Sequence, residues 1–185
     1  IFVSFFISGI FFYLISLKIV GNKFFSSFST TLYLLYPYLL GHALFNPKDI
    51  PFLCFWTACT YFSFVIFDKL TEDKYPNYWD IILLSFLSAF LLSIRITGIL
   101  ILFQYLITFL IFLNFDKLNW KIFLRFIYKK FLIFIFSFAL FVYILYPVFW
   151  KDPLLFFTAI EYMGKYYHDV CTLTLGKCMA AKNLD

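Results

Sequence analysis

Long runs of residues without a charged side chain limit most strongly how this chain can fold. The runs cover residues 1–17, 24–47, 50–67, 81–115 and 131–150. Arg95 is the single exception, a charge inside the fourth run. A helix that crosses the hydrocarbon core of a bilayer needs roughly 20 mostly apolar residues. The chain is also 64% hydrophobic and only 14% charged, whereas soluble domains are about 25% charged. We therefore expect an all-α, polytopic bundle of transmembrane helices.

Six segments are expected to cross the membrane, and the chain divides into two regions. The predicted spans are residues 1–18, 24–45, 50–68, 78–95, 97–115 and 131–149. Residues 1–150 form the transmembrane region in this interpretation, and residues 151–185 form the start of an extracytoplasmic segment. The chain begins without Met and ends without a terminating pattern, so we also expect it to be an internal segment of a longer membrane protein.

The positions of the basic residues predict the orientation of the chain. Cytoplasmic loops carry an excess of Lys and Arg. Alternate loops hold most of the 15 basic residues, namely Lys18, Lys23, Lys69, Lys74, Lys117, Lys121, Arg125, Lys129 and Lys130. We place these loops on the cytoplasmic side of a bacterial inner membrane, so the remaining loops and the tail face the non-cytoplasmic side. The net charge of +5 does not indicate a nucleic-acid partner, because the lysines are scattered through these loops.

Polar residues between the second and third predicted spans are the first candidates for function. The segment Gly41–Phe52 reads GHALFNPKDIPF and places His42, Lys48 and Asp49 at the membrane edge, where charges are costly and are often functional. Its two prolines end one helix and begin the next. Asp49 is then expected at or near a helix N-cap, where a carboxylate accepts backbone N–H bonds. The structural alternatives are a capping Asp49, a snorkelling Lys48 and a packing His42.

Arg95 is the second candidate, because it is the only charge in residues 81–115 and lies near the non-cytoplasmic end of a span. Its permanently charged guanidinium requires an anionic partner, and the planar fork fits phosphate or carboxylate. The alternative is an arginine that reaches outward to lipid headgroups. Thr97 and Gly98 follow it and allow the chain to turn closely behind it.

The four cysteines give weaker indications. Cys54 and Cys59 lie within an apolar span and are interpreted as packing residues. Cys171 and Cys178 lie in the polar tail, where a disulfide between them is one possibility. No Cys and His grouping has the spacing of a metal site, so Asp49 is the only candidate metal ligand.

The order of these motifs resembles a known family of enzymes. GHALFNPKDIPF is followed by SIRITG at Ser93–Gly98, YPVFWKDP at Tyr146–Pro153 and LGKCMAAKNL at Leu175–Leu184. This order is similar to that of GT-C-fold membrane glycosyltransferases of the protein O-mannosyltransferase and dolichyl-phosphate-mannose-transferase-like superfamily. NPKD resembles an arginine-proline-aspartate type loop of that superfamily. SIRITG resembles its threonine-lysine-glycine position, with Arg95 in place of the more usual lysine.

The resemblance implies a function at the non-cytoplasmic membrane surface. Such enzymes transfer a sugar from a polyprenyl-phosphate donor to a protein, lipid or glycan acceptor. Arg95 and Lys48 would bind the donor phosphate, Asp49 would be the second acidic residue of the site, and His42 would assist it. A divalent metal at Asp49 is one further implication. The first-loop catalytic acid of the family is expected upstream of Ile1, so we do not expect this segment to be active alone.

Two other classes of function remain open on the sequence. In a transporter or flippase for a lipid-linked or anionic substrate, Asp49 and Arg95 would bind the substrate during alternating access. Transporter sites usually lie near the bilayer midplane between repeats, and no repeat is visible in the sequence. In a structural membrane subunit, Asp49 would only cap a helix and Arg95 would only contact headgroups.

Overall fold

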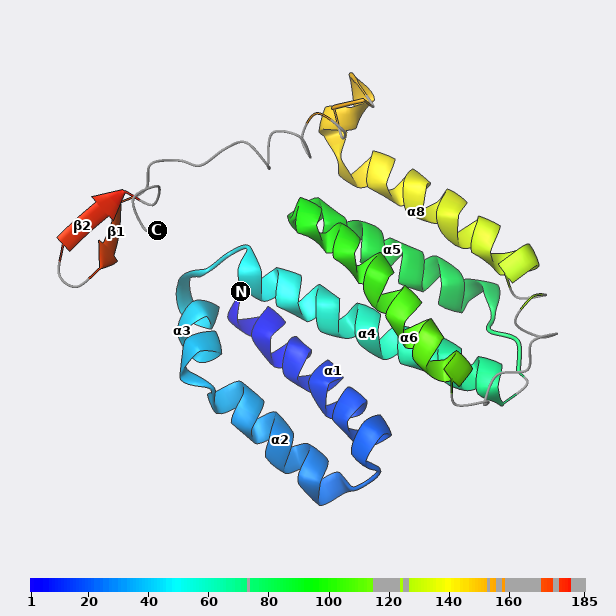
Figure 1. Ribbon diagram of the computed structural model, residues 1–185, viewed down its shortest axis with the longest axis horizontal. Coiled ribbons are helices and arrows are strands. Elements are labelled where there is room, and N and C mark those ends of the chain that lie inside the picture. The colour runs from blue at the N-terminus through cyan, green and yellow to red at the C-terminus, as the bar shows by residue number, and fades with distance from the viewer. Residues whose placement is uncertain are drawn as a thin grey trace. The chain divides into compact units, whose positions relative to one another are not determined.

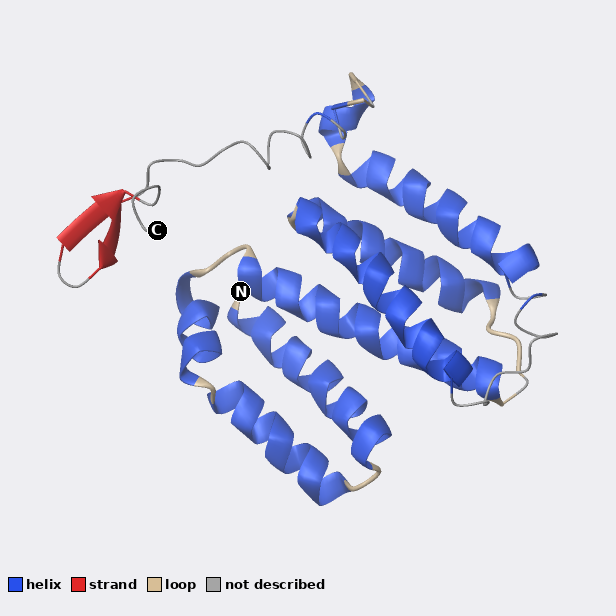
Figure 2. Ribbon diagram, viewed as in Figure 1, coloured by secondary structure: helices blue, strands red, loops and turns tan. Residues whose placement is uncertain are grey.

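The structure, a computed structural model, describes residues 1–72, 74–114, 124, 127–152, 154, 155, 158, 171–174 and 177–180. It divides the chain into two compact units, Ile1–Tyr146 and Pro147–Asp185. The first unit, in its described part, consists of helices joined by short loops (Figure 1, Figure 2). The expected helical class is therefore confirmed for this unit.

The helices in the described part of the first unit follow one another closely from Phe2 to Asn114. They are α1 (Phe2–Val20), α2 (Lys23–Leu35), α3 (Pro37–Phe45), α4 (Asp49–Thr71), α5 (Tyr78–Ile94), the 3-10 helix η1 (Ile96–Leu100), α6 (Ile101–Asn114), the π-helix η2 (Ile127–Phe131) and α8 (Leu132–Leu145). Gly21 ends α1 with a φ of 69°, a left-handed conformation that glycine adopts without steric cost. Asn22 then begins α2 by accepting hydrogen bonds from the backbone N–H groups of Phe24 and Phe25.

Three helical stretches are long and apolar enough to cross a membrane: Phe2–Val20, Asp49–Leu70 and Tyr128–Leu145. They correspond to the first, third and sixth predicted spans. The fourth and fifth predicted spans are the shorter apolar stretches Tyr78–Ile94 and Ile96–Leu110. The described part of the structure therefore does not confirm six full-length spans.

The second predicted span, residues 24–45, is wrong as a single helix. The structure divides it at Tyr36, whose extended backbone has φ −62° and ψ 116°. Pro37 is the cause, because a proline disfavours helical geometry in the residue before it and cannot donate a backbone hydrogen bond. It is instead the first residue of α3. Helices α2 and α3 return the chain along α1 as two pieces set at an angle (Figure 1).

Small polar residues connect the helices of the first unit. The hydroxyls of Ser88 and Tyr105, 2.9 Å apart, join α5 to α6, and the hydroxyls of Ser85 and Ser137, 2.7 Å apart, join α5 to α8. In the same way, Gln104 Nε2 donates to Thr60 Oγ1 at 2.7 Å, between α6 and α4. Such contacts are typical of helix packing in membranes, where apolar side chains alone give little preference for a protein partner over lipid.

Opposite ends of this unit carry different polar groups. At one end, which we name the basic end, Lys18 pairs with Asp68 and Lys69 pairs with Asp80. Lys130 lies at the same end, because its ammonium donates to the carbonyl of Pro76, just before α5. At the other end, the α3–α4 loop meets the turn between α5 and η1 through an ion pair between Asp49 and Arg95. The described basic loops thus gather at one end, while the side of the membrane that this end faces stays a prediction.

The second unit contains the 3-10 helix η3 (Pro147–Trp150) and an antiparallel hairpin of β1 (Cys171–Thr174) and β2 (Lys177–Ala180). The sequence analysis did not predict these strands. Their register pairs Cys171 with Ala180 and Leu173 with Cys178. A disulfide between the two cysteines stays a prediction, because their side chains lie outside what the structure describes, as does most of the region 151–185.

Candidate functional site

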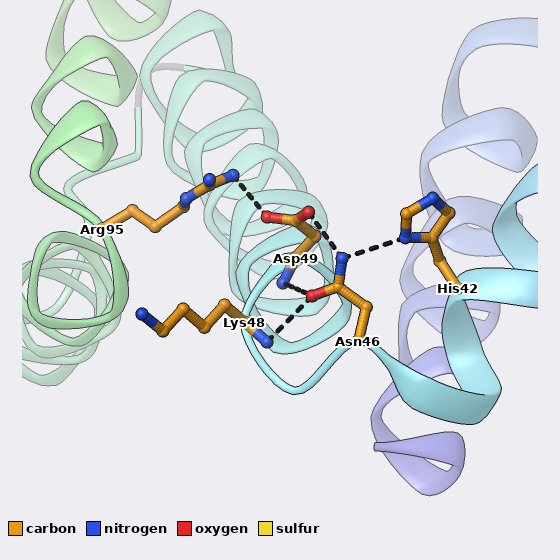
Figure 3. A network of polar contacts seen from close by, with 5 residues as sticks. All are labelled: His42, Asn46, Lys48, Asp49 and Arg95. Carbon is orange, nitrogen blue, oxygen red and sulfur yellow. Dashed lines mark hydrogen bonds and ion pairs between the residues drawn. The ribbon is translucent and has the colours of Figure 1, made fainter. Parts of the chain in front are cut away.

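The α3–α4 loop is organised by the side chain of Asn46 (Figure 3). Its Oδ1 accepts hydrogen bonds from the backbone N–H groups of Lys48 at 3.2 Å and Asp49 at 2.9 Å. Its Nδ2 donates to Asp49 Oδ2 at 2.7 Å and contacts His42 Nδ1 at 2.9 Å. Both partners of Oδ1 are donors only, which fixes the orientation of the amide. Asn46 therefore accepts hydrogen bonds from backbone N–H groups at the start of α4 and also positions the side chains of His42 and Asp49.

The same contacts indicate which ring nitrogen of His42 is the acceptor. An amide nitrogen can only donate, so His42 Nδ1 must accept the bond from Asn46. In the neutral ring, the tautomer that fits this contact carries its proton on Nε2. The ring of Tyr38 lies 4.3 Å from that of His42 and the ring of Phe45 lies 5.1 Å away, centroid to centroid. His42 is thus both a packing residue, which was the structural alternative, and a hydrogen-bonded member of the loop.

Asp49 is the first residue of α4, and its carboxylate binds two side chains. One oxygen accepts from Asn46 and the other accepts from a guanidinium nitrogen of Arg95. At this helix end the backbone N–H groups of Lys48 and Asp49 donate to Asn46, and the Asp49 carboxylate is bound by side chains, which differs from the capping role expected for it. The negative charge of Asp49 still lies in the first turn of α4, where the helix dipole favours it.

Arg95 is placed by the close packing of the turn between α5 and η1. The residue is extended, with φ −147° and ψ 136°, and its carbonyl accepts from Gly98 N at 2.8 Å. Gly98 lies so near the last turn of α5 that a Cβ there would be 2.8 Å from backbone atoms of Leu91 and Leu92. The turn directs the Arg95 side chain back to Asp49, which is 46 residues earlier in the sequence.

The ion pair lies in the wall of a cavity of about 530 Å³. This volume is within the range of about 300–1,000 Å³ that is usual for small-molecule sites. The wall is mostly apolar and aromatic, with a few polar groups, and consists of Tyr38, Leu39, His42, Asp49, Ile50, Phe52, Leu53, Trp56, Arg95, Thr97 and Leu100. The side chains of Arg95 and Asp49 are 50% and 42% exposed, so solutes reach both. An accessible pair of this kind adds only about 0–1 kcal/mol to stability.

The structure brings together three of the four predicted site residues. His42, Asp49 and Arg95 line the cavity, whereas Lys48 is exposed and is not part of its described wall. The described residues contain no group of three or more His, Cys, Asp and Glu side chains able to hold a metal ion. Within the part of the chain that the structure describes, Asp49 thus does not belong to a group of three such side chains, and the divalent metal expected from the sequence stays a prediction.

Sequence reasoning missed Asn46 and the aromatic wall formed by Tyr38 and Trp56. Asn46 was detectable, because an asparagine before a proline favours a turn in which its side chain binds backbone N–H groups. The aromatic residues gave no such signal in a chain that is 26% aromatic.

Comparisons with known protein families, curated proteins and solved structures gave no match. The candidate function of the site is therefore argued from its geometry and from the resemblance of its motifs.

Proposed function

We propose that this chain contributes the non-cytoplasmic site of a membrane glycosyltransferase, which moves a sugar from a polyprenyl-phosphate donor to a protein, lipid or glycan acceptor. One observation carries the proposal: a carboxylate and a guanidinium form an accessible pair in the wall of a mostly apolar cavity, at the end of the bundle opposite the basic loops. A donor with an isoprenoid chain, a phosphate and a sugar needs apolar, cationic and hydrogen-bonding surfaces close together.

Arg95 is assigned to the donor phosphate. During transfer, the bond between the phosphate oxygen and the anomeric carbon breaks, and the electron pair remains on the leaving phosphate. A guanidinium stabilises that charge through paired hydrogen bonds, which suit the geometry of phosphate. Before the donor binds, the Arg95 guanidinium is paired with the Asp49 carboxylate. The donor phosphate must therefore displace this carboxylate from Arg95.

Asp49 is assigned to the acceptor. Exchange at Arg95 releases the Asp49 oxygen that faced it, while the other oxygen stays bound to Asn46 Nδ2 at 2.7 Å. The released oxygen can orient the acceptor hydroxyl and take its proton as the acceptor oxygen bonds to the anomeric carbon. A positioned general base of this kind contributes about 10²–10⁴-fold to a rate. His42 presents the Nε2–H of its neutral ring as a hydrogen-bond donor in the same wall.

The test is sugar transfer by the full-length protein in membrane vesicles supplied with radiolabelled polyprenyl-phosphate sugars. Asp49→Asn keeps the shape of the side chain and removes the base, so transfer should fall by about 10²-fold or more. Arg95→Ala should reduce the rate of transfer by a comparable factor, because a positioned charge in an active site contributes about 10²–10³-fold to the rate.

Asp68→Asn is the matched control, because it breaks a similarly exposed ion pair with Lys18 at the basic end. It should leave transfer unchanged. Undiminished transfer in folded Asp49→Asn protein would remove Asp49 from the site. Failure of the wild type to consume any donor in a broad panel would refute the proposed function.

A further inference from the structure

A second cavity lies between α4, α5, α6 and α8, away from the site already described. Its volume is about 430 Å³, and its wall includes Ile66, Leu84, Phe109 and Phe134. It reaches the basic end of the unit, since Lys130 is part of the wall. None of the residues that line the first cavity lines this one.

The polar groups of this wall differ in how many hydrogen-bond or ionic partners the protein gives them. Ser63 donates to the carbonyl of Thr60 at 2.8 Å, and the hydroxyl of Tyr105 pairs with that of Ser88 at 2.9 Å. Both hydroxyls therefore have protein partners, and neither demands a polar ligand. Lys130 is the one charged group in the described wall.

Lys130 is a buried cation that forms no ion pair with any described carboxylate. Only 8% of it is exposed. Its ammonium donates to the carbonyl of Pro76 and lies 4.2 Å from the centroid of the Tyr78 ring. Within the part of the chain that the structure describes, these contacts use only part of the donor capacity of an ammonium. Among the residues that the structure describes, no carboxylate forms an ion pair with Lys130.

The nearby carboxylate is already engaged. Asp80 Oδ2 accepts from Lys69 Nζ at 2.6 Å and from the backbone N–H of Asn77 at 2.8 Å. Lys69 is neutralised by the first contact, and the second is part of the capping box of α5. Asp80 acts on Lys130 through space but, in the described part of the chain, does not contact it, and a buried charge that lacks a contacting counter-charge is unfavourable. The wall of the cavity thus offers one positive charge for an anion brought by a ligand.

The cavity also opens on the outer surface of the unit. Three wall residues are substantially exposed: Leu106 and Phe131 at 51% each, and Ile135 at 43%. All three are apolar, and they belong to α6, η2 and α8, respectively. In a bilayer, such a surface faces acyl chains. A ligand therefore enters sideways from the lipid and carries an apolar chain and an anionic headgroup.

We propose that this cavity binds one anionic phospholipid, with an acyl chain between α4, α6 and α8 and its headgroup phosphate against Lys130. The inference does not depend on the proposed transferase function, because it concerns a separate cavity at the opposite end of the unit. The bound lipid fills the apolar space and neutralises the buried ammonium.

The test is native mass spectrometry of the full-length protein after equilibration with vesicles of equal parts phosphatidylglycerol and phosphatidylcholine. The wild-type protein should retain phosphatidylglycerol in preference to phosphatidylcholine. Lys130→Met should reduce the preference roughly fivefold, because one Lys near an anionic surface contributes about 1 kcal/mol. Lys129→Met is the matched control, since Lys129 is the exposed neighbour in sequence, and it should behave like wild type.

A second variant tests the cavity without changing its charge. Leu106→Trp places a larger side chain at the exposed edge and should reduce retention of both lipids, while Lys130→Arg should keep the preference. Equal retention of the two lipids by wild type, or an unchanged preference in Lys130→Met, would overturn the proposal. The proposal would also be overturned if Leu106→Trp retained as much of both lipids as the wild-type protein does, or if a polyprenyl phosphate were recovered in place of the phospholipid.

Discussion

Replacing Gly98 by alanine should destabilise the turn that holds Arg95. An added Cβ would lie 2.8 Å from Leu91 C, Leu91 O and Leu92 N, whereas ordinary van der Waals contact begins at 3.4 Å. The difference between these two distances, 0.6 Å, must be supplied by movement of backbone. The crowded atoms belong to the last turn of α5, so no flexible side chain can move aside.

The expected cost is about 1–3 kcal/mol, the usual range for overpacking a buried position. For a protein of this size, 1 kcal/mol corresponds to a fall in Tm of about 2–4 °C. Because Arg95 lies between Leu91 and Gly98, the shift should also move its guanidinium away from Asp49. The assay is thermal unfolding of the detergent-solubilised protein, followed by size-exclusion chromatography of the fraction that stays folded.

Gly41→Ala is the matched control. Gly41 lies inside α3, and a Cβ there would meet nothing within 4 Å. Alanine is also the better helix former by about 1 kcal/mol. Gly41→Ala should therefore keep or raise the Tm, while Gly98→Ala lowers it. Equal Tm values for the two variants would refute the packing argument for the Arg95 turn.

Two further predictions concern single contacts. Asn46→Ala removes the acceptor for the first N–H groups of α4 and should cost about 1 kcal/mol, measured as a lower Tm; an unchanged Tm would mean that water replaces the amide fully. A double-mutant cycle of Ser85→Ala and Ser137→Ala should give a coupling free energy of about 0.6 kcal/mol, because their hydroxyls lie 2.7 Å apart between α5 and α8. Strict additivity in steric-trapping measurements of unfolding would contradict that contact.

The contacts of the candidate site divide into local and distant ones. His42, Asn46 and Asp49 lie close together in sequence, around the end of α3 and the start of α4, and their hydrogen bonds span three or four residues. Local rules for prolines and asparagine turns are sufficient for such a loop. The loop is predictable from the sequence, whereas the role of Asn46 is masked by the neighbouring carboxylate of Asp49, which is an equally good acceptor for backbone N–H groups.

The break between α2 and α3 has a local cause as well. Pro37 was present in the sequence, and its effect on the preceding residue is general. In membrane helices, however, neighbouring groups often satisfy the freed backbone and let the helix continue with a kink. Whether Tyr36 interrupts the helix or bends it depends on its surroundings, and residues 24–45 were accordingly predicted as one span.

The sequence by itself determined that this chain is an apolar, helical protein with basic loops separated from a polar loop at Asn46–Asp49, because hydrophobicity and proline act over a few residues. Only the tertiary structure decided that Asp49 meets Arg95 and that both lie in one cavity with Tyr38 and Trp56. That pairing depends on α4 packing beside α5 and on Gly98 allowing a tight turn. Helix packing is the sum of many weak contacts between residues far apart in the chain, and no short motif encodes it.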